Sequence, residues 1–86
     1  MPLQILNAPD ATTDQLRKAL EAAFPGDAIE VTAGGAGHFE LRVVSKQFEG
    51  KSRVQQQQLV YKAIGELLAG DAAPVHAIDR MDTRAP

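Results

Sequence analysis

The segment FEGKSRV at residues 48–54 constrains the fold most, because it combines a turn signal with the start of a helix. Gly50 supplies the turn, and Ser52 followed three residues later by Gln55 is the pattern of a capping box. Apolar residues then recur at helical spacing until Gly70, a typical helix stop. They are Val60, Ala63, Ile64, Leu67 and Leu68. The pattern predicts a long amphipathic helix.

A first helix is predicted upstream of this segment. Thr12 followed by Gln15 is a second capping-box pattern. Apolar residues continue at helical spacing until Pro25-Gly26, which should end the helix. They are Leu16, Ala19, Leu20, Ala23 and Phe24. Residues 1–11 are therefore interpreted as an N-terminal extension.

Alternating residues predict a β-hairpin between the two helices. Apolar and polar residues alternate at 29–32 and again at 38–43, on either side of a glycine-containing loop at 34–37. Residues 75–81 predict a third strand, which should run parallel to another strand because a helix precedes it. With a short helical turn before the long helix, the order is αββααβ. The predicted fold class is α+β, in two layers, with helices on one face of a three-stranded mixed sheet.

Length and composition agree with one small domain, placed at residues 12–81 and followed by a short tail at 82–86. The chain has 86 residues, of which 44% are hydrophobic, and such a thin core leaves little room for a deep active site. Ser45, Ser52 and the histidines form no recognisable nucleophile motif, so an enzyme is not expected. The N-terminal residues lack a basic start and a long apolar run, and we expect a cytoplasmic protein with no membrane partner.

The charges are distributed unevenly along the chain. Residues 42–62 contain five basic residues and one acidic residue, whereas the chain as a whole has a net charge of -2. This basic region is either a solvated helix face or a patch that binds anions. Nucleic acid phosphates and an acidic protein surface would both fit such a patch. The acidic balance of the whole chain favours a protein partner.

The two histidines, His38 and His76, are the residues with obvious metal chemistry, because the chain has no cysteine. Two histidines this far apart are more often ordinary surface side chains than a metal site. The strand pattern places His38 on the same side as Glu40, opposite Phe39, so its side chain should point away from the core. The strand pattern places His76 on the same side as Ile78. The alternative to a metal ligand is therefore a partly buried histidine whose ring is hydrogen-bonded to a backbone carbonyl.

Two motifs resemble the signature of the BolA family: FEGKSR at residues 48–53 and VHA at residues 75–77. The resemblance extends over residues 12–81. It implies the predicted element order, in an arrangement like the class II KH fold. KH proteins grip nucleic acid with a GxxG loop between helices. Gly34 to Gly37 matches that string but should lie between strands, so we interpret it as a hairpin loop.

BolA-like proteins resemble adaptors that pair with monothiol glutaredoxins and share a 2Fe-2S cluster, in iron-sulfur trafficking or iron homeostasis. His76 matches the histidine of the VHA motif, and His38 matches a histidine that one branch of the family carries before its second strand. The resemblance thus implies two histidine ligands in a heterodimer. The thiolates would come from a glutaredoxin cysteine and glutathione. The isolated protein should not hold a stable cluster.

An alternative function is transcription regulation, because some BolA-like proteins are linked to DNA binding through the segment after FEGKS. Here that segment carries four glutamines, at 55–58, which we interpret as a solvated helix face. The tail also stops short of the family's usual acidic, tryptophan-bearing end. Contacts with a partner, glutathione or phosphate are expected from the FEGKSR residues, namely Phe48, Glu49, Gly50, Lys51, Ser52 and Arg53.

Overall fold

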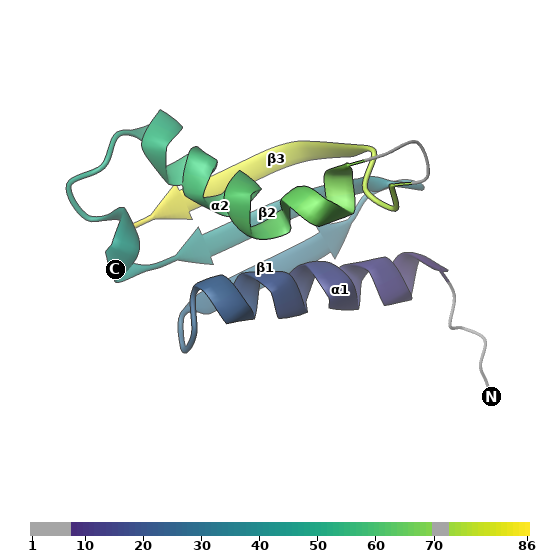
Figure 1. Cartoon of the computed structure of the whole chain (residues 1–86), viewed down its shortest axis with the longest axis horizontal. Coiled ribbons are helices and arrows are strands. Elements are labelled where there is room, and N and C mark those ends of the chain that lie inside the picture. Colours follow the sequence, from purple (N-terminus) through teal and green to yellow (C-terminus); the bar gives the residue numbers. More distant parts are fainter. Residues whose placement is uncertain (1–7, 70–72) are drawn as a thin grey trace.

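A computed structural model describes residues 8–69 and 73–86, and in it two helices cover one face of a three-stranded sheet (Figure 1). The elements are α1 (Ala8–Ala23), β1 (Ala28–Ala33), β2 (His38–Val44), the short 3-10 helix η2 (Lys46–Phe48), α2 (Arg53–Leu68) and β3 (Ala77–Arg84). The predicted fold class and element order are confirmed, with η2 as the expected short helical turn.

The sheet has the order β1-β2-β3, so β2 is the central strand. β1 and β2 pair antiparallel as a hairpin, and β3 pairs parallel to β2 after the crossover through α2. This confirms the predicted parallel strand. Because parallel strands start at the same end of a sheet, the residues that open β2 and β3 become neighbours.

A register shift interrupts the pairing of β2 with β3. Phe39 pairs with Ile78, whereas the next residue of β2, Glu40, pairs with Arg80. Asp79 is therefore an extra residue in β3, in the manner of a β-bulge. The side chains of β3 therefore do not alternate without interruption between the two faces of the sheet, as the sequence alone had suggested. The alternation reverses at Asp79.

The core lies between the sheet and the helices. Phe39, Leu41 and Val43 of β2 are at most 2% exposed, as their alternation predicts. α1 packs against β1 and α2, and α2 packs against β3. Phe48 joins the same core, with its ring centroid 5.4 Å from that of Phe24 and the rings tilted by 55°. The first residue of the FEGKSR motif is thus a core residue and not a contact surface.

The boundaries of two elements differ from the predictions. α1 begins at Ala8, so Thr12 is a buried residue within the helix and not its cap. Pro9 is compatible with this earlier start because a helix tolerates proline in its first turn. β3 ends at Arg84 and not at residue 81, so most of the predicted tail belongs to the sheet.

The capping box at the start of α2 is confirmed. The Ser52 hydroxyl accepts a hydrogen bond from the backbone N–H of Gln55, and the Gln55 side chain accepts one from the backbone N–H of Ser52. α2 ends at Leu68 with Ala69 as its cap. The predicted stop at Gly70 lies outside the described residues. No helix among residues 8–69 and 73–86 is long and apolar enough to cross a membrane.

Replacing Phe48 by alanine should destabilise the protein through the loss of a fully buried ring. We expect the free energy of unfolding to fall by about 3–5 kcal/mol, measured by urea denaturation. Val54→Ala is the control, because Val54 is 62% exposed and its truncation should change stability by about 0.5 kcal/mol or less. Equal effects of the two substitutions would contradict the core assignment of Phe48.

Candidate functional site

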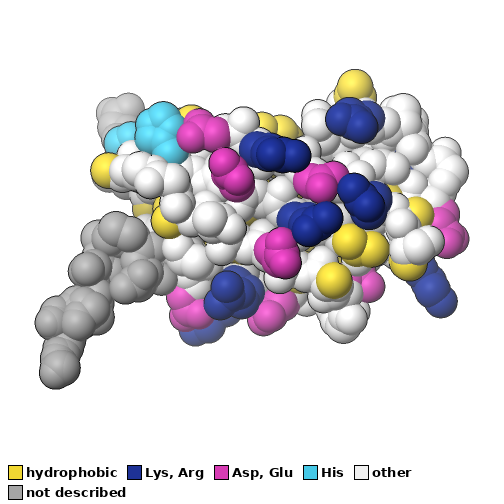
Figure 2. All heavy atoms as spheres, turned by 180° about the vertical axis from the view of Figure 1, so that it is seen from behind, with side chains coloured by type: hydrophobic (Ala, Val, Ile, Leu, Met, Phe, Trp, Pro, Cys, Tyr) yellow, Lys and Arg dark blue, Asp and Glu magenta, His cyan; other side chains and the backbone are white. Residues whose placement is uncertain are grey.

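The two histidines lie together at one end of the sheet. His38 is the first residue of β2, and His76 directly precedes β3. The backbone N–H groups of His76 and Ala77 both donate to the carbonyl oxygen of Gly37, at 2.8 and 3.1 Å. The parallel pairing thus brings residues 38 positions apart to one corner, where Figure 2 shows the histidine side chains in cyan. We call this place the histidine corner.

Gly37 is required at this corner for two reasons. Its φ is +75°, in the left-handed region that favours glycine. In addition, a Cβ on Gly37 would lie 2.7 Å from Cγ and 2.9 Å from Nδ1 of His76. The imidazole of His76 therefore packs directly on the backbone of Gly37. The loop at 34–37 is the hairpin loop predicted from the sequence, but its contact with His76 had no signal in the sequence.

Both imidazoles are accessible from outside the protein. The side chain of His38 is 47% exposed, which confirms that it points away from the core. Its Nδ1 lies 3.1 Å from Oδ1 of Asp79, the extra residue of the bulge. His76 is also exposed, so the alternative of a partly buried histidine is wrong.

The histidine corner offers an incomplete ligand set. Among the described residues, no group of three or more histidine, cysteine or carboxylate side chains could hold a metal ion. The chain has no cysteine. A 2Fe-2S cluster takes four ligands, and histidines can replace two of its cysteines. Two exposed imidazoles therefore fit such a cluster only when another molecule supplies the remaining ligands.

The FEGKSR motif lies at the opposite end of the sheet from the histidines. It follows the last residue of β2, whereas His38 is the first, and Figure 1 shows the two ends well separated. A strand of this length spans about 20 Å. The structure therefore does not bring the two sets of predicted site residues into one site.

Within the motif, three residues have structural roles. Phe48 is a core residue, Gly50 takes a φ of +75° at the turn, and Ser52 caps α2. The remaining three are exposed and available for contacts, namely Glu49, Lys51 and Arg53. The motif thus serves mainly to shape the turn and to start the helix.

Gln56 has a structural role that the sequence did not predict. Its amide Nε2 donates to the carbonyl oxygens of Phe48 and Lys51, at 3.2 and 3.1 Å. Its Oε1 accepts a hydrogen bond of 2.7 Å from the hydroxyl of Thr83 in β3. The interpretation of the four glutamines as a solvated face is wrong for Gln56, which joins the turn to the sheet. Gln55 is exposed and completes the predicted capping box.

The turn at Phe48-Glu49-Gly50 is called the FEG turn. A hollow of about 490 Å³ lies beside it, along α2. Two lysines, Lys51 and Lys62, contribute positive charge to it, and no acidic side chain lines it. The other lining residues are Gly50, Gln55, Gln58 and Leu59. We call this the basic hollow. Its charge and its glutamine amides suit an anion with several oxygen atoms.

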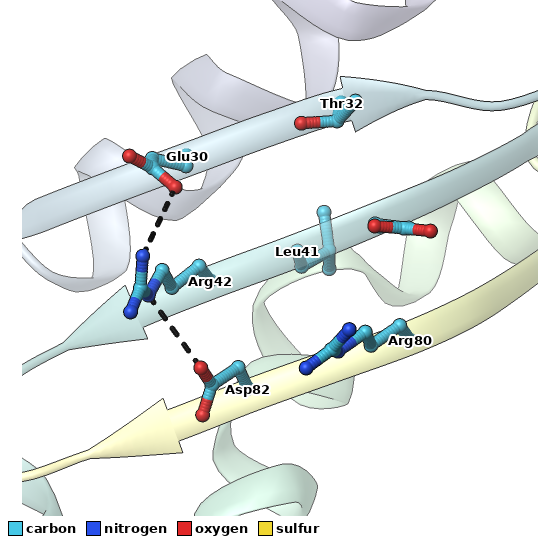
Figure 3. Close-up of a pocket in the computed structure, with 7 residues that line it drawn as sticks. Glu30, Thr32, Leu41, Arg42, Arg80 and Asp82 are labelled. Atoms are coloured by element: carbon cyan, nitrogen blue, oxygen red, sulfur yellow. Dashed lines mark ion pairs between the residues drawn. The ribbon is translucent and has the colours of Figure 1, made fainter.

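The open face of the sheet carries charges of both signs. Arg42 on the central strand reaches Glu30 on one side, at 3.7 Å, and Asp82 on the other, at 3.5 Å (Figure 3). These residues line a second, shallow hollow of about 250 Å³. Because the charges largely neutralise one another and the pairs are exposed, they keep this face polar and contribute little to stability.

Comparisons with known proteins agree with the fold and with the motifs. The family model described as BolA-like protein matches residues 17–86. The chain belongs to the BolA family. It is 46% identical over 66 residues to an uncharacterized protein in the rpoN-murA intergenic region of Acinetobacter guillouiae. That match covers 77% of this chain and 76% of the Acinetobacter protein. It is 40% identical over 72 residues to mouse BolA-like protein 1, covering 73% of this chain. The chain spans about half the length of that mouse protein.

Solved structures of the family have the same fold. The BolA domain of SufE1 from Arabidopsis thaliana superposes with a TM-score of 0.74 at 30% identity, covering 88% of this chain and 93% of that one. The solution structure of mouse BolA1 gives a TM-score of 0.69 at 35% identity, covering 86% of this chain and 64% of that one. The fold and family expected from the two motifs are thus confirmed.

Substituting Gly37 by alanine should displace the imidazole of His76. The new Cβ would overlap the ring, and a positive φ costs a non-glycine residue about 1–2 kcal/mol. We expect lower stability in urea and a large change in the NMR resonances of His76.

Gly35→Ala is the matched control, because a Cβ at Gly35 meets nothing within 4 Å. It should leave both the stability and the His76 resonances close to those of the parent. Unchanged His76 resonances in folded Gly37→Ala would contradict the packing of the ring on this glycine.

Proposed function

We propose that this protein is an adaptor that shares a 2Fe-2S cluster with a monothiol glutaredoxin at the histidine corner. The observation that carries the proposal is the pair of exposed imidazoles, His38 and His76, which β2 and β3 bring to one end of the sheet, where the described residues form no group of three or more side chains that could hold a metal ion. The cluster is cargo held between two proteins.

The proposed ligands are one imidazole from each histidine, the active-site cysteine of the glutaredoxin and the thiol of glutathione. This set supplies the four ligands that the cluster requires, two of them nitrogen and two of them sulfur. This chain can supply only the nitrogen ligands, because it has two histidines and no cysteine. The isolated protein is expected to hold no stable cluster.

Family membership supports a BolA-type role, as an adaptor or regulator. One of the solved relatives is the BolA domain of SufE1. The glutaredoxin partner and the shared cluster are inferences from the chemistry of the corner and from the resemblance to the family. The FEGKSR motif lies at the opposite end of the sheet from the proposed cluster ligands. We therefore place the glutaredoxin contact at the histidine corner and not at the FEGKSR motif.

The test mixes the protein with a monothiol glutaredoxin, glutathione and reconstituted cluster, and records visible absorption and circular dichroism. We expect a distinct spectrum of the heterocomplex with the parent, which His76→Ala and His38→Ala each weaken or abolish because a nitrogen ligand is removed. If the parent leaves the spectrum of the glutaredoxin cluster unchanged, the proposal is wrong.

Lys51→Ala is the matched control for this experiment, because Lys51 is exposed but lies at the opposite end of the sheet. The spectrum of the heterocomplex should remain that of the parent. A reduction as large as that of His76→Ala would place the glutaredoxin at the FEGKSR end instead of the corner.

A second candidate function is DNA binding, and the basic hollow is the observation that favours it. Lys51 and Lys62 line a hollow without acidic residues, and Arg53, two positions after Lys51 in the chain, is also exposed. Phosphate contacts of this kind give affinity that depends on salt and little on sequence. The position of the hollow, remote from the histidines, allows this function to be tested separately.

For DNA binding we expect Lys51→Ala combined with Lys62→Ala to weaken binding to duplex DNA. In a plot of the logarithm of the binding constant against the logarithm of the salt concentration, the slope should become less steep. The expected change is about 1 for each phosphate that a lysine no longer neutralises. Fluorescence anisotropy at several salt concentrations measures both effects, and His76→Ala should bind as the parent does. Identical salt dependence of the parent and the double variant would exclude the hollow as a DNA site.

A further inference from the structure

His38 has a carboxylate partner that the strand pattern did not predict. Asp79 is the extra residue of the bulge, and its Oδ1 lies 3.1 Å from Nδ1 of His38. The two side chains are 50% and 47% exposed, so the contact lies at the surface of the histidine corner. We propose that Asp79 is a positioning residue that holds the imidazole of His38 with its Nε2 atom directed to the shared cluster. This inference rests on the proposed function.

The bulge places the Asp79 carboxylate between the His38 ring and the hairpin loop. A Cβ on Gly34 would lie 3.9 Å from Oδ2 of Asp79, so the carboxylate also borders the loop. The backbone of His38 is fixed at the same place, because its carbonyl accepts from the N–H of Gly34 at 2.8 Å and its own N–H donates to the carbonyl of Gly35 at 3.0 Å. With the backbone held by the loop and Nδ1 held by Asp79, the ring has little freedom to turn.

The contact also selects one form of the imidazole. An ionised carboxylate can only accept hydrogen bonds, so a neutral imidazole bonded to Asp79 must carry its proton on Nδ1. The lone pair is then on Nε2, the atom that remains for a metal. Histidines that ligate metals commonly donate their second N–H to a carboxylate in this way, which fixes the ring and raises its basicity as a ligand.

The two histidines are thus held by different means. The ring of His76 packs on the backbone of Gly37, and among the described residues no hydrogen bond of its side chain is found. His38 instead has the Asp79 carboxylate 3.1 Å from its Nδ1, and we infer that this contact orients its ring. Gly37 thus supports the ring of His76, and Asp79 supports the ring of His38.

An ordinary surface ion pair between Asp79 and a protonated imidazole is the competing interpretation. Such a pair contributes little to stability and presents no lone pair to a metal. The two interpretations differ in the tautomer of the neutral ring, because only a positioning contact keeps the proton on Nδ1. The tautomer of His38, compared between the parent and Asp79→Ala, therefore decides between them without any cluster being present.

The first test measures the imidazole nitrogens of His38 by long-range proton-nitrogen NMR at a pH of about 8. In the parent protein we expect a neutral ring with the proton on Nδ1. In Asp79→Ala the Nδ1–H tautomer loses its acceptor, and we expect the ring to shift toward the Nε2–H form. Asp79→Asn, which keeps the shape of the side chain and an acceptor oxygen, should shift less.

Asp82→Asn is the matched control, because Asp82 is a carboxylate on the same strand that pairs with Arg42 and Arg84. It should leave the tautomer of His38 as in the parent. A neutral His38 ring with its proton on Nε2 in the parent, or the same tautomer in the parent and Asp79→Ala, would overturn the inference. Unchanged backbone resonances away from the corner verify that each variant is folded.

The second test repeats the glutaredoxin experiment with the Asp79 variants. Loss of a carboxylate beside a ligating histidine typically lowers metal affinity about ten- to a hundredfold. We expect Asp79→Ala to weaken cluster retention in the heterocomplex in this range, with a smaller effect for Asp79→Asn. Retention equal to that of the parent would overturn the positioning role. Failure of the parent to form any heterocomplex would instead reject the proposed function, while the tautomer measurement would still decide whether Asp79 orients His38.

Discussion

The pairing of β3 beside β2 is the constraint on which the histidine corner depends. One carbonyl group, that of Gly37, accepts the backbone N–H groups of His76 and Ala77 where the two strands begin. Because the pairing is parallel, both strands begin at the same end, and His38 follows directly in β2. An antiparallel β3 would have placed His76 at the far end of the sheet, beside the FEG turn. The crossover through α2 is therefore what makes two distant histidines neighbours.

The FEGKSR motif contributes to this arrangement from the opposite end of the molecule. Its phenylalanine fills the core, its serine starts α2, and Gln56 joins the turn to Thr83 of β3. These contacts fix where α2 begins and how the turn meets the C-terminal end of β3. Half of the residues of this family motif, Phe48, Gly50 and Ser52, therefore act through the fold.

Much of this fold could be predicted from the sequence, because its signals are local. Alternation revealed the buried face of β2, and the Ser52 and Gln55 pair revealed the start of α2. The bulge at Asp79 could not be predicted, since it depends on how β3 registers against a strand far away in the chain. The contacts of Gln56 and the packing of His76 on Gly37 are equally non-local. The prediction for the start of α1 failed for another reason, because Thr12 and Gln15 match a capping pattern within a helix that had already begun.

Under the proposed function, the limited ligand set of the corner would require a cluster to be shared and not held by this chain alone. In that case two exposed imidazoles would leave the other two ligands of the cluster to a partner. A neutral nitrogen ligand also lacks the negative charge of a thiolate, which is the chemical difference through which histidine ligation alters the properties of such clusters. The proposed function would need an accurately formed end of a sheet and not a deep cavity, and a domain of this size can provide such an end.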